Sequence, residues 1–362
     1  MSGPCAKGAR RTRGLTLVEL VVAAGLLTIL IVTLLRLLDD FLSLWQLSEL
    51  RRRTAEEASG ISELLAADLA NLEGGSRGDF LAEWAFFDSD GDGTAESKWP
   101  RVRMVRHASA RELALHKAGR AAVERDQGLL EVVWTVLPAR SNASSPDLRA
   151  EGVLWRGEQL YGGEGDVSIF APAFLSAAGR PSPNAIEEVS SGILWLGLEF
   201  ARPTTLLYDG WKLGTDLETA LPAWDAWGKG RANAERHVWN EAAAGLPEPA
   251  GRPVLPRRAR LEIELEQERD LVRRTRLVRA VEPTEGSFPI EDARRLPKDA
   301  GAHVLIEGEW MRVRSVSGDV VSVERAQRGT QASAHARGAL VHFGATLVRE
   351  VPLTSSREDW TR

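Results

Sequence analysis

Residues 14–36 read GLTLVELVVAAGLLTILIVTLLR, and the organisation of the chain can be followed outward from this stretch. From Leu15 to Leu35 it holds 21 residues with a single charge, Glu19, and Arg36 closes it. A helix of that length rises about 30 Å, which matches the hydrocarbon thickness of a bilayer. We therefore expect residues 15–36 to form a transmembrane helix.

The segment before this helix is basic. Residues 1–14 carry four positive charges and no negative ones, at Lys7, Arg10, Arg11 and Arg13. By the positive-inside rule this end stays cytoplasmic and the rest of the chain is exported. A cleaved secretory signal would have a shorter apolar run, and a plain anchor does not explain Glu19, because an unpaired carboxylate in lipid costs a few kcal/mol.

The run from Gly14 to Leu20 resembles the processing motif of type IV prepilins and type II secretion pseudopilins. The resemblance implies that a prepilin peptidase cuts after Gly14 and that Leu15 becomes the N-methylated first residue. Glu19 is then the fifth residue of the mature chain. Leu15 departs from the family pattern, in which Phe is usual.

Cleavage after Gly14 would give Glu19 a role in assembly. It creates a free α-amine on Leu15, and a buried carboxylate is stabilised by an opposite charge nearby. The amine of an adjacent subunit could pair with Glu19 and set the axial register between subunits. The alternative is a Glu19 that stays protonated or reaches the membrane interface.

The helix is expected to continue beyond the membrane, because no proline occurs between Pro4 and Pro100. Apolar residues at helical spacing are interleaved with the polar residues Glu63, Asp68 and Asn71. These apolar residues are Ile61, Leu64, Leu65, Leu69 and Leu72. Gly74-Gly75 is the predicted end, so residues 37–73 would form a periplasmic continuation of the helix.

Residues 74–282 are predicted to form an antiparallel β head. Short strand-like runs are separated by Gly, Pro and Asp without long helices between them, which favours antiparallel pairing. The predicted strands are Arg101–Arg106, Leu129–Leu137, Gly192–Phe200, Ala259–Glu266, Arg274–Val281, Glu309–Ser317, Val320–Arg325 and Thr346–Val351. The expected class is α+β: a long N-terminal helix packed on an antiparallel sheet, as in the pseudopilin fold, with a small β insertion.

The order of short motifs in the head resembles the minor pseudopilin J of type II secretion systems. The motifs are Asp68-Leu69, Val102–Arg106, Glu131-Val132, Leu154–Gly157, Gly192–Leu194, Trp211 and Leu255-Pro256. Glu19 argues against the K type, which typically lacks that acid, and the chain is far longer than a major pseudopilin. The resemblance implies a structural subunit, not an enzyme, that assembles with other minor and major pseudopilins.

Residues 283–343 look like an insertion. They resemble a small β module found in phage tail proteins and in some large bacterial surface proteins, and Ser317-Gly318-Asp319 is a hairpin turn signal. We expect a structural addition, with a binding role as the alternative. Residues 344–362 would hold the tail and a last strand that rejoins the main sheet.

One loop has the spacing of a calcium site. Asp88, Asp90, Asp92 and Glu96 occupy loop positions one, three, five and nine, but position twelve lacks an acid. The alternatives are a calcium site completed by another carboxylate and a simple Asp/Gly turn joining the long helix to the first strand. No other cofactor is expected.

The net charge and the motifs of the sequence restrict the classes of function that fit this chain. The net charge of −5 disfavours nucleic acid as a partner, and no HExxH or P-loop motif is present. The chain has one cysteine, Cys5, which excludes a disulfide framework. The sequence therefore predicts a J-like minor pseudopilin, a single-pass bacterial inner-membrane protein in contact with lipid, with its head in the periplasm. The alternatives are a minor pilin of a type IV pilus or competence system, and a membrane-anchored periplasmic hydrolase or glycan-binding protein.

Overall fold

A computed structural model describes most of the helix, the sheets and some connections. The described residues are 17–87, 97–117, 128–138, 152–162, 168–170, 186–201, 208–209, 224–227, 253, 255–256, 258–266, 275–293, 296–297 and 301–353. By its internal contacts the chain divides into two compact units, Met1–Arg53 and Thr54–Arg362.

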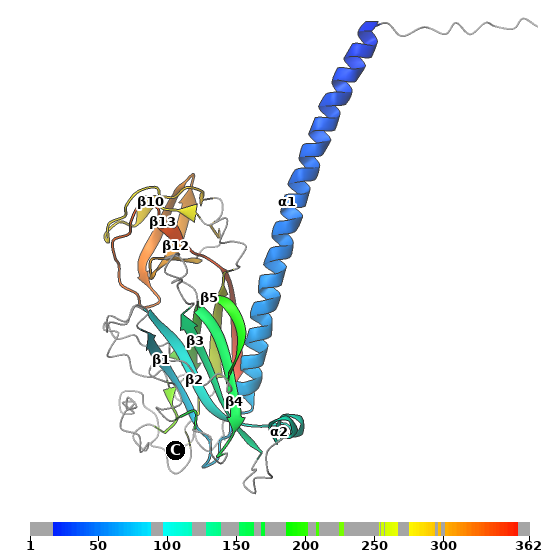
Figure 1. The fold of residues 1–362 in the computed structure, drawn as a ribbon. Coiled ribbons are helices and arrows are strands. Elements are labelled where there is room, and N and C mark those ends of the chain that lie inside the picture. The colour runs from blue at the N-terminus through cyan, green and yellow to red at the C-terminus, as the bar shows by residue number, and fades with distance from the viewer. Residues whose placement is uncertain are drawn as a thin grey trace, which may run out of the picture. The chain divides into compact units, whose positions relative to one another are not determined.

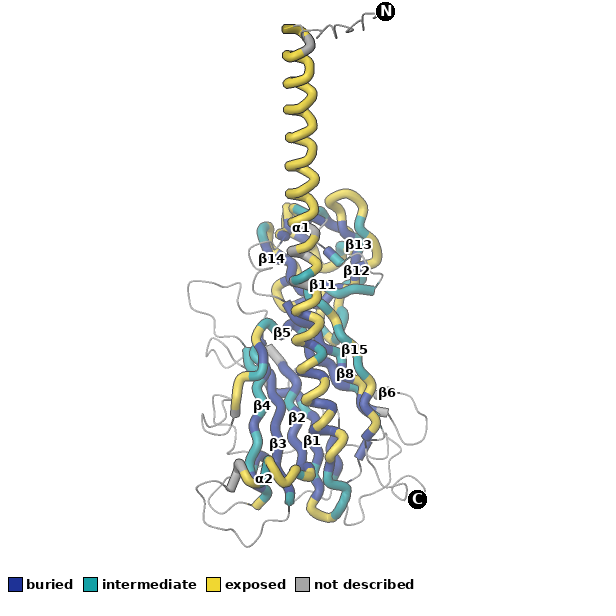
Figure 2. The backbone as a smooth tube through the Cα atoms, turned by 90° about the vertical axis from the view of Figure 1, so that its right-hand side faces the viewer, coloured by how far each residue is buried: buried dark blue, intermediate teal, exposed yellow. Residues whose placement is uncertain are grey.

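Helix α1 (Leu17–Ala70) is 54 residues long, so it begins in the first unit and ends in the second. Its segment Leu20–Leu42 has a mean hydropathy of 2.5 and no buried residues, and the tube is exposed throughout this segment (Figure 2). Thr28 and Thr33 donate their hydroxyls to the carbonyls of Ala24 and Ile29, both at 2.8 Å. The chain therefore has one N-terminal helix long and apolar enough to span a membrane.

The helix ends at Ala70, before the predicted Gly74-Gly75 stop. The cause is pairing of residues 71–73 with strand β2 (Ser97–His107). Glu73 donates its backbone N–H to the Val105 carbonyl (3.0 Å), and the backbone N–H of His107 donates to the Asn71 carbonyl (2.8 Å). These bonds hold the chain in an extended conformation that a helix cannot adopt.

The second unit is built on a nine-stranded sheet in which every pair is antiparallel (Figure 1). The strand order is β15-β8-β5-β4-β3-β2-β1-β7, and β6 pairs with β5. Besides β2, the members are β1 (Phe80–Phe87), β3 (Leu129–Pro138), β4 (Gly152–Leu160), β5 (Ile186–Ala201), β6 (Tyr208–Asp209), β7 (Trp224–Asp225), β8 (Arg258–Leu265) and β15 (Ala345–Pro352). A short helix, α2 (Ala110–Lys117), follows β2. The expected α+β class is confirmed at this level.

Most of the predicted strands are present. Seven of them coincide with or lie within β2, β3, β5, β8, β12, β13 and β15, give or take a residue at their ends. The prediction of a strand over Arg274–Val281 is largely wrong, because only Thr275–Arg276 is a strand, β9. Strands β1 and β4 are not among the predicted ones, since FLAEWAFF lacks alternation and GVLWRGEQL contains two glycines.

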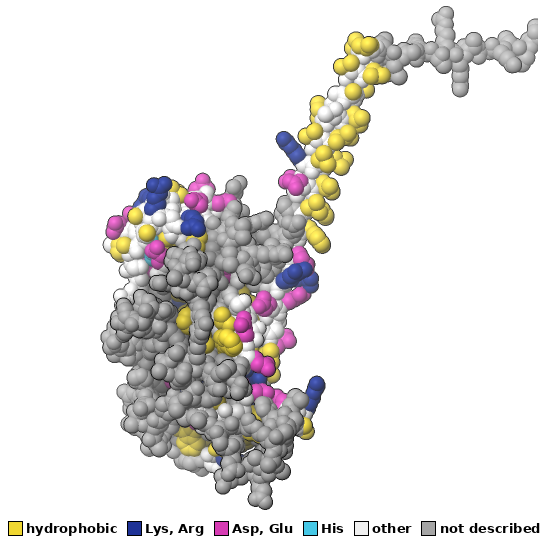
Figure 3. All heavy atoms as spheres, viewed as in Figure 1, with side chains coloured by type: hydrophobic (Ala, Val, Ile, Leu, Met, Phe, Trp, Pro, Cys, Tyr) yellow, Lys and Arg dark blue, Asp and Glu magenta, His cyan; other side chains and the backbone are white. Residues whose placement is uncertain are grey.

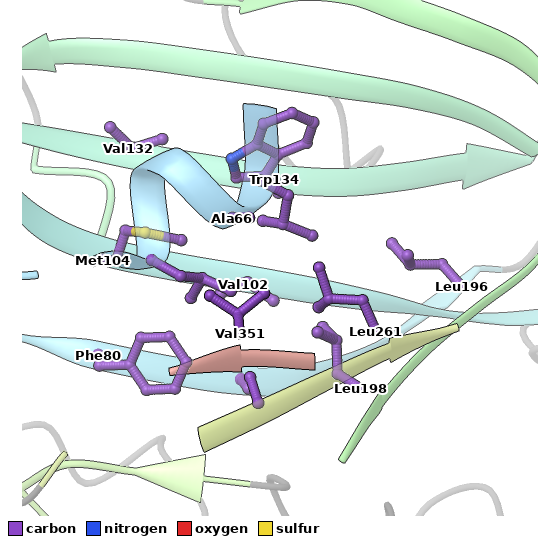
Figure 4. Close-up of a cluster of buried hydrophobic side chains, with 14 of the residues drawn as sticks. Ala66, Phe80, Val102, Met104, Val132, Trp134, Leu196, Leu198, Leu261 and Val351 are labelled. Carbon is purple, nitrogen blue, oxygen red and sulfur yellow. The ribbon is translucent and has the colours of Figure 1, made fainter. Parts of the chain in front are cut away.

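The main core lies between the last turns of α1 and one face of the sheet (Figure 4). Ile61, Leu65 and Leu69 of the predicted apolar face are buried there, with Ala58 and Ala66 beside them. Two assignments are wrong. Leu64 is 48% exposed, and Asp68, one of the polar residues interleaved with the apolar ones, is buried.

A separate β module is inserted between β8 and β15, which pair with each other as the two halves of a hairpin. Its four-stranded sheet has the order β10-β13-β12-β11, formed by β10 (Ser287–Pro289), β11 (His303–Ile306), β12 (Glu309–Ser317) and β13 (Val320–Gln327). The two ends of the module meet in a ladder of β9 with β14 (Leu340–Val341). The predicted hairpin turn and the return of the last strand to the main sheet are confirmed.

Candidate functional site: the N-terminal helix and its clamp on the sheet

The residues predicted for processing and assembly lie at or before the start of α1. Gly14 and Leu15 are outside the described residues. Glu19 lies in the first turn of α1, and its side chain is not described. The motif therefore stays a sequence prediction, placed at the beginning of the apolar helix.

The residues predicted to bind calcium, Asp88, Asp90, Asp92 and Glu96, also lie outside the described residues. In the sequence these residues lie between β1 and β2, which pair with each other as far as Phe87 and Ser97. The alternative of a turn between the long helix and the first strand is therefore wrong in its position, because β1 precedes the loop. Among the described residues, no group of three or more His, Cys, Asp or Glu side chains could hold a metal ion.

Hydrophobic side chains cover the N-terminal part of α1 on the face seen in Figure 3. Every large apolar residue described from Leu17 to Trp45 is exposed, and a hydrocarbon environment would remove this surface from water. After Glu19, the next charged residues are Arg36, Asp39 and Asp40. The segment has the length and the surface of a membrane anchor.

The C-terminal turns of α1 are joined to the sheet by a buried charged cluster, which we call the Asp68 clamp: Asp68, Arg106, Trp134 and Arg156. Trp134 donates its indole N–H to Asp68 Oδ2 at 2.7 Å. Arg156 donates from Nε (2.9 Å) and Nη2 (3.1 Å), and Arg106 Nε lies 2.9 Å from Asp68 Oδ1. One carboxylate of the helix thus contacts three strands, β2, β3 and β4.

Two further acids balance the positive charge of the clamp. Glu158 lies 2.7 Å from Arg156 and 3.4 Å from Arg106. Glu112 of α2 accepts a 2.6 Å hydrogen bond from Arg106, and this bond is the main cause that lowers the pKa of Glu112 to about 2. Burial lowers the pKa of Arg156, but bonds to Asp68 and Glu158 outweigh burial and raise it above its usual value. Three acids, Asp68, Glu112 and Glu158, therefore lie against the two arginines.

Glu112 also fixes the start of α2. Ser109 donates its backbone N–H to Glu112 Oε2 (2.7 Å), and Glu112 donates its own to Ser109 Oγ (3.3 Å). This reciprocal pair is a capping box. The short helix thereby presents Glu112 to Arg106 in a defined position.

A sequence signal for the clamp exists. Arg106 follows Val102 and Met104 on one face of β2, and Arg156 follows Leu154 on one face of β4; all three of these neighbours are buried in the main core. A charged residue on the buried face of a strand requires a partner of opposite charge. The partner, Asp68, is far away in the sequence, so the pattern could indicate a buried ion pair without identifying it.

The opposite face of β3 carries a buried acid, Glu131. Its carboxylate accepts hydrogen bonds from Gln159 (2.7 Å), Ser168 (2.9 Å) and the Ile169 backbone N–H (2.9 Å). Burial raises the pKa of Glu131, as it does for many catalytic acids. Here three groups of the same chain occupy the carboxylate, so Glu131 anchors residues 168–170 to the sheet.

The chain was compared with models of known protein families, with characterised proteins and with solved structures, and nothing matched.

Proposed function

We propose that this chain is a minor pseudopilin of the J type, a structural subunit of a type II secretion pseudopilus. One observation carries the proposal: the prepilin-like motif Gly14–Leu20 stands at the start of an apolar helix that continues without a break to Ala70. The end of that helix packs on one face of an antiparallel sheet. This is the architecture that the family resemblance implies.

In this proposal the apolar part of α1 has two successive environments. A prepilin peptidase removes residues 1–14 at the cytoplasmic side of the inner membrane, and Leu15 is methylated. The helix then leaves the lipid and packs among the helices of other pseudopilins, where Glu19 pairs with a neighbour's α-amine. The head stays in the periplasm, held to the helix by the Asp68 clamp.

The proposed assembly role of Glu19 is tested by its replacement. The full chain is co-expressed with prepilin peptidase and the other pseudopilins, and incorporation into filaments is measured by immunoblotting of sheared fractions. Glu19→Gln should be processed normally but lost from filaments. The control is Glu49→Gln, because Glu49 lies on the same helix and already pairs with Arg52 and Arg53. Equal incorporation of both variants would contradict the pairing.

A minor pilin of a type IV pilus or competence system is the second candidate, since it would share the motif and the helix. Co-expression with a major pseudopilin in one strain and with a major pilin in another distinguishes the two. The proposal expects incorporation with the pseudopilin only.

A further inference from the structure

Arg328 of the inserted module reaches the main sheet. Its guanidinium donates to Glu264 Oε2 (2.7 Å) and to Glu262 Oε1, two acids on β8. It also lies over two indole rings, 4.9 Å from the centroid of Trp195 on β5 and 4.2 Å from that of Trp310 on β12. A guanidinium between two aromatic faces gains cation–π attraction from both, and more so when it is shielded from water.

The joint is dry. Arg328 has a side-chain exposure of 7% and Glu264 one of 1%. Burial raises the pKa of the Glu264 carboxyl, while Arg328 and the backbone N–H of Gly344 act in the opposite direction. Removing one partner of such a pair leaves an uncompensated buried charge. The loss of Arg328 should therefore destabilise the joint more than the loss of one partner destabilises a surface ion pair.

The module holds Arg328 in place through an unusual backbone. Arg328 has φ of 49°, Ala326 has φ of 57°, and Gly329 follows with φ of 71°. Left-handed φ values in residues other than glycine cost about 1 kcal/mol each and persist where surrounding contacts impose them. Here Ala326 donates its N–H to Glu309 (3.1 Å), and Thr330 accepts the N–H of Trp310 (3.0 Å).

Two further contacts lie between the described residues of the module and those of the main sheet. Leu305 and Trp310 of the module form a small buried cluster with Leu194 of β5. His342 Nδ1 lies 2.9 Å from Glu266 Oε2, just beyond β8. The module and the main sheet otherwise have separate hydrophobic cores.

The chain connectivity makes the position of the module depend on this small joint. Both connections of the module leave the same hairpin, β8–β15, and the β9–β14 ladder brings its two ends together. A module that is attached at one place can change its orientation unless a second contact restrains it.

We propose that Arg328 is a latch: seated between Trp195 and Trp310 and bound to Glu262 and Glu264, it fixes the folded module on the sheet, and without it the module moves as a separate folded body. The two states would differ in the position of the module and not in the folding of either part. This inference does not depend on the proposed function.

Distance measurement between two spin labels tests the latch in the full-length chain in detergent. The labels are placed on Glu187→Cys in β5 and Asp319→Cys in the module hairpin, both exposed, in a Cys5→Ser background. The parent and the control Arg314→Ala should show one narrow distance peak, because Arg314 is 63% exposed and pairs only loosely with Glu324. Arg328→Ala should lose the narrow peak. An unchanged narrow peak in Arg328→Ala would overturn the proposal.

Hydrogen exchange distinguishes a residue that positions the module from a residue that the module needs in order to fold. In Arg328→Ala the amides of β8, β12 and β13 should keep their protection, and loss of protection in β12 and β13 would overturn the latch. If Arg328→Ala does not fold, the variant Arg328→Met with Glu262→Gln and Glu264→Gln removes all three charges together. A broad distance distribution in that folded variant supports the latch, and a narrow one overturns it.

Discussion

At the residue scale, the carboxylate of Asp68 joins α1 to the sheet. Two arginines and an indole N–H surround it, and it is 4% exposed. The burial of Asp68 could be predicted from the sequence, but its partners could not. Asp68 lies three residues after Leu65 and four before Leu72, so helical spacing places it on the apolar face, but its partners come from strands far away in the sequence. The local pattern shows a charged residue on the apolar face of the helix, and only the tertiary structure shows which residues neutralise it.

Asp68→Asn should destabilise the protein by roughly 3–5 kcal/mol, because Arg106 and Arg156 would lose a buried counter-charge. The measurement is chemical denaturation of the full chain in detergent, followed by tryptophan fluorescence. Glu63→Gln is the matched control on the same helix, since Glu63 is 65% exposed and 3.7 Å from Arg349. Its effect should stay below about 1 kcal/mol. Similar losses in both variants would contradict the clamp.

Glu309 should make the module sensitive to acid. Burial works against its charged form, but bonds from Arg325, His335 and the Ser333 and Ala326 N–H groups lower its pKa to about 2. A folded pKa below the unfolded value of about 4.5 stabilises the folded state above pH 4.5, and this stability is lost as pH falls from about 4.5 to about 2.

Glu309→Gln should therefore be less stable than the parent at pH 6 and show a flatter stability profile between about pH 4.5 and pH 2. Hydrogen exchange of β12 and β13 across this range measures it. Glu324→Gln is the control and should follow the parent, because this side chain on β13 is 39% exposed. A parent-like slope in Glu309→Gln would show that another group carries the acid sensitivity.

At the element scale, predictability follows from how each element is buried. The apolar run and the absence of proline predict α1, and strands with alternating faces, such as β8, are predictable as well. The sequence could not show that Glu264 of β8 and Glu266, just beyond the end of β8, are buried beneath Arg328 and His342 of the insertion. The alternation of apolar and polar residues predicts the two faces of a strand, but it does not predict which later segment of the chain covers each face.

The pairing of β5 with β8 depends on a glycine. Gly192 has φ of 73°, and a Cβ there would lie 2.3 Å from the carbonyl oxygen of Glu266. Gly162→Ala is the matched control, since its φ is 65° and nothing lies within 4 Å. The control should cost about 1 kcal/mol for the backbone conformation. Gly192→Ala should lose roughly 1–3 kcal/mol more from the clash, and equal losses on denaturation would contradict the close approach.

At the scale of the whole molecule, the account requires one membrane crossing with the basic end inside. Cys5 is the only cysteine, so it reports on the N-terminal segment. In intact cells, a membrane-impermeant maleimide that passes the outer membrane should not label Cys5 in an unprocessed Gly14→Ala chain. It should label Asp319→Cys in a Cys5→Ser chain, because the head is expected in the periplasm. The reverse labelling pattern would contradict the orientation.

The first residue of the mature chain shows whether the chain is processed as a prepilin. The chain is produced with an active prepilin peptidase, purified from the membrane and analysed by mass spectrometry of its N-terminal peptide. Gly25→Ala serves as the control for Gly14→Ala, because a Cβ at Gly25 meets nothing within 4 Å. We predict a methylated Leu15 as the first residue of the parent and of Gly25→Ala, and an uncleaved Gly14→Ala. A parent chain that keeps residues 1–14 beside the active peptidase would contradict it.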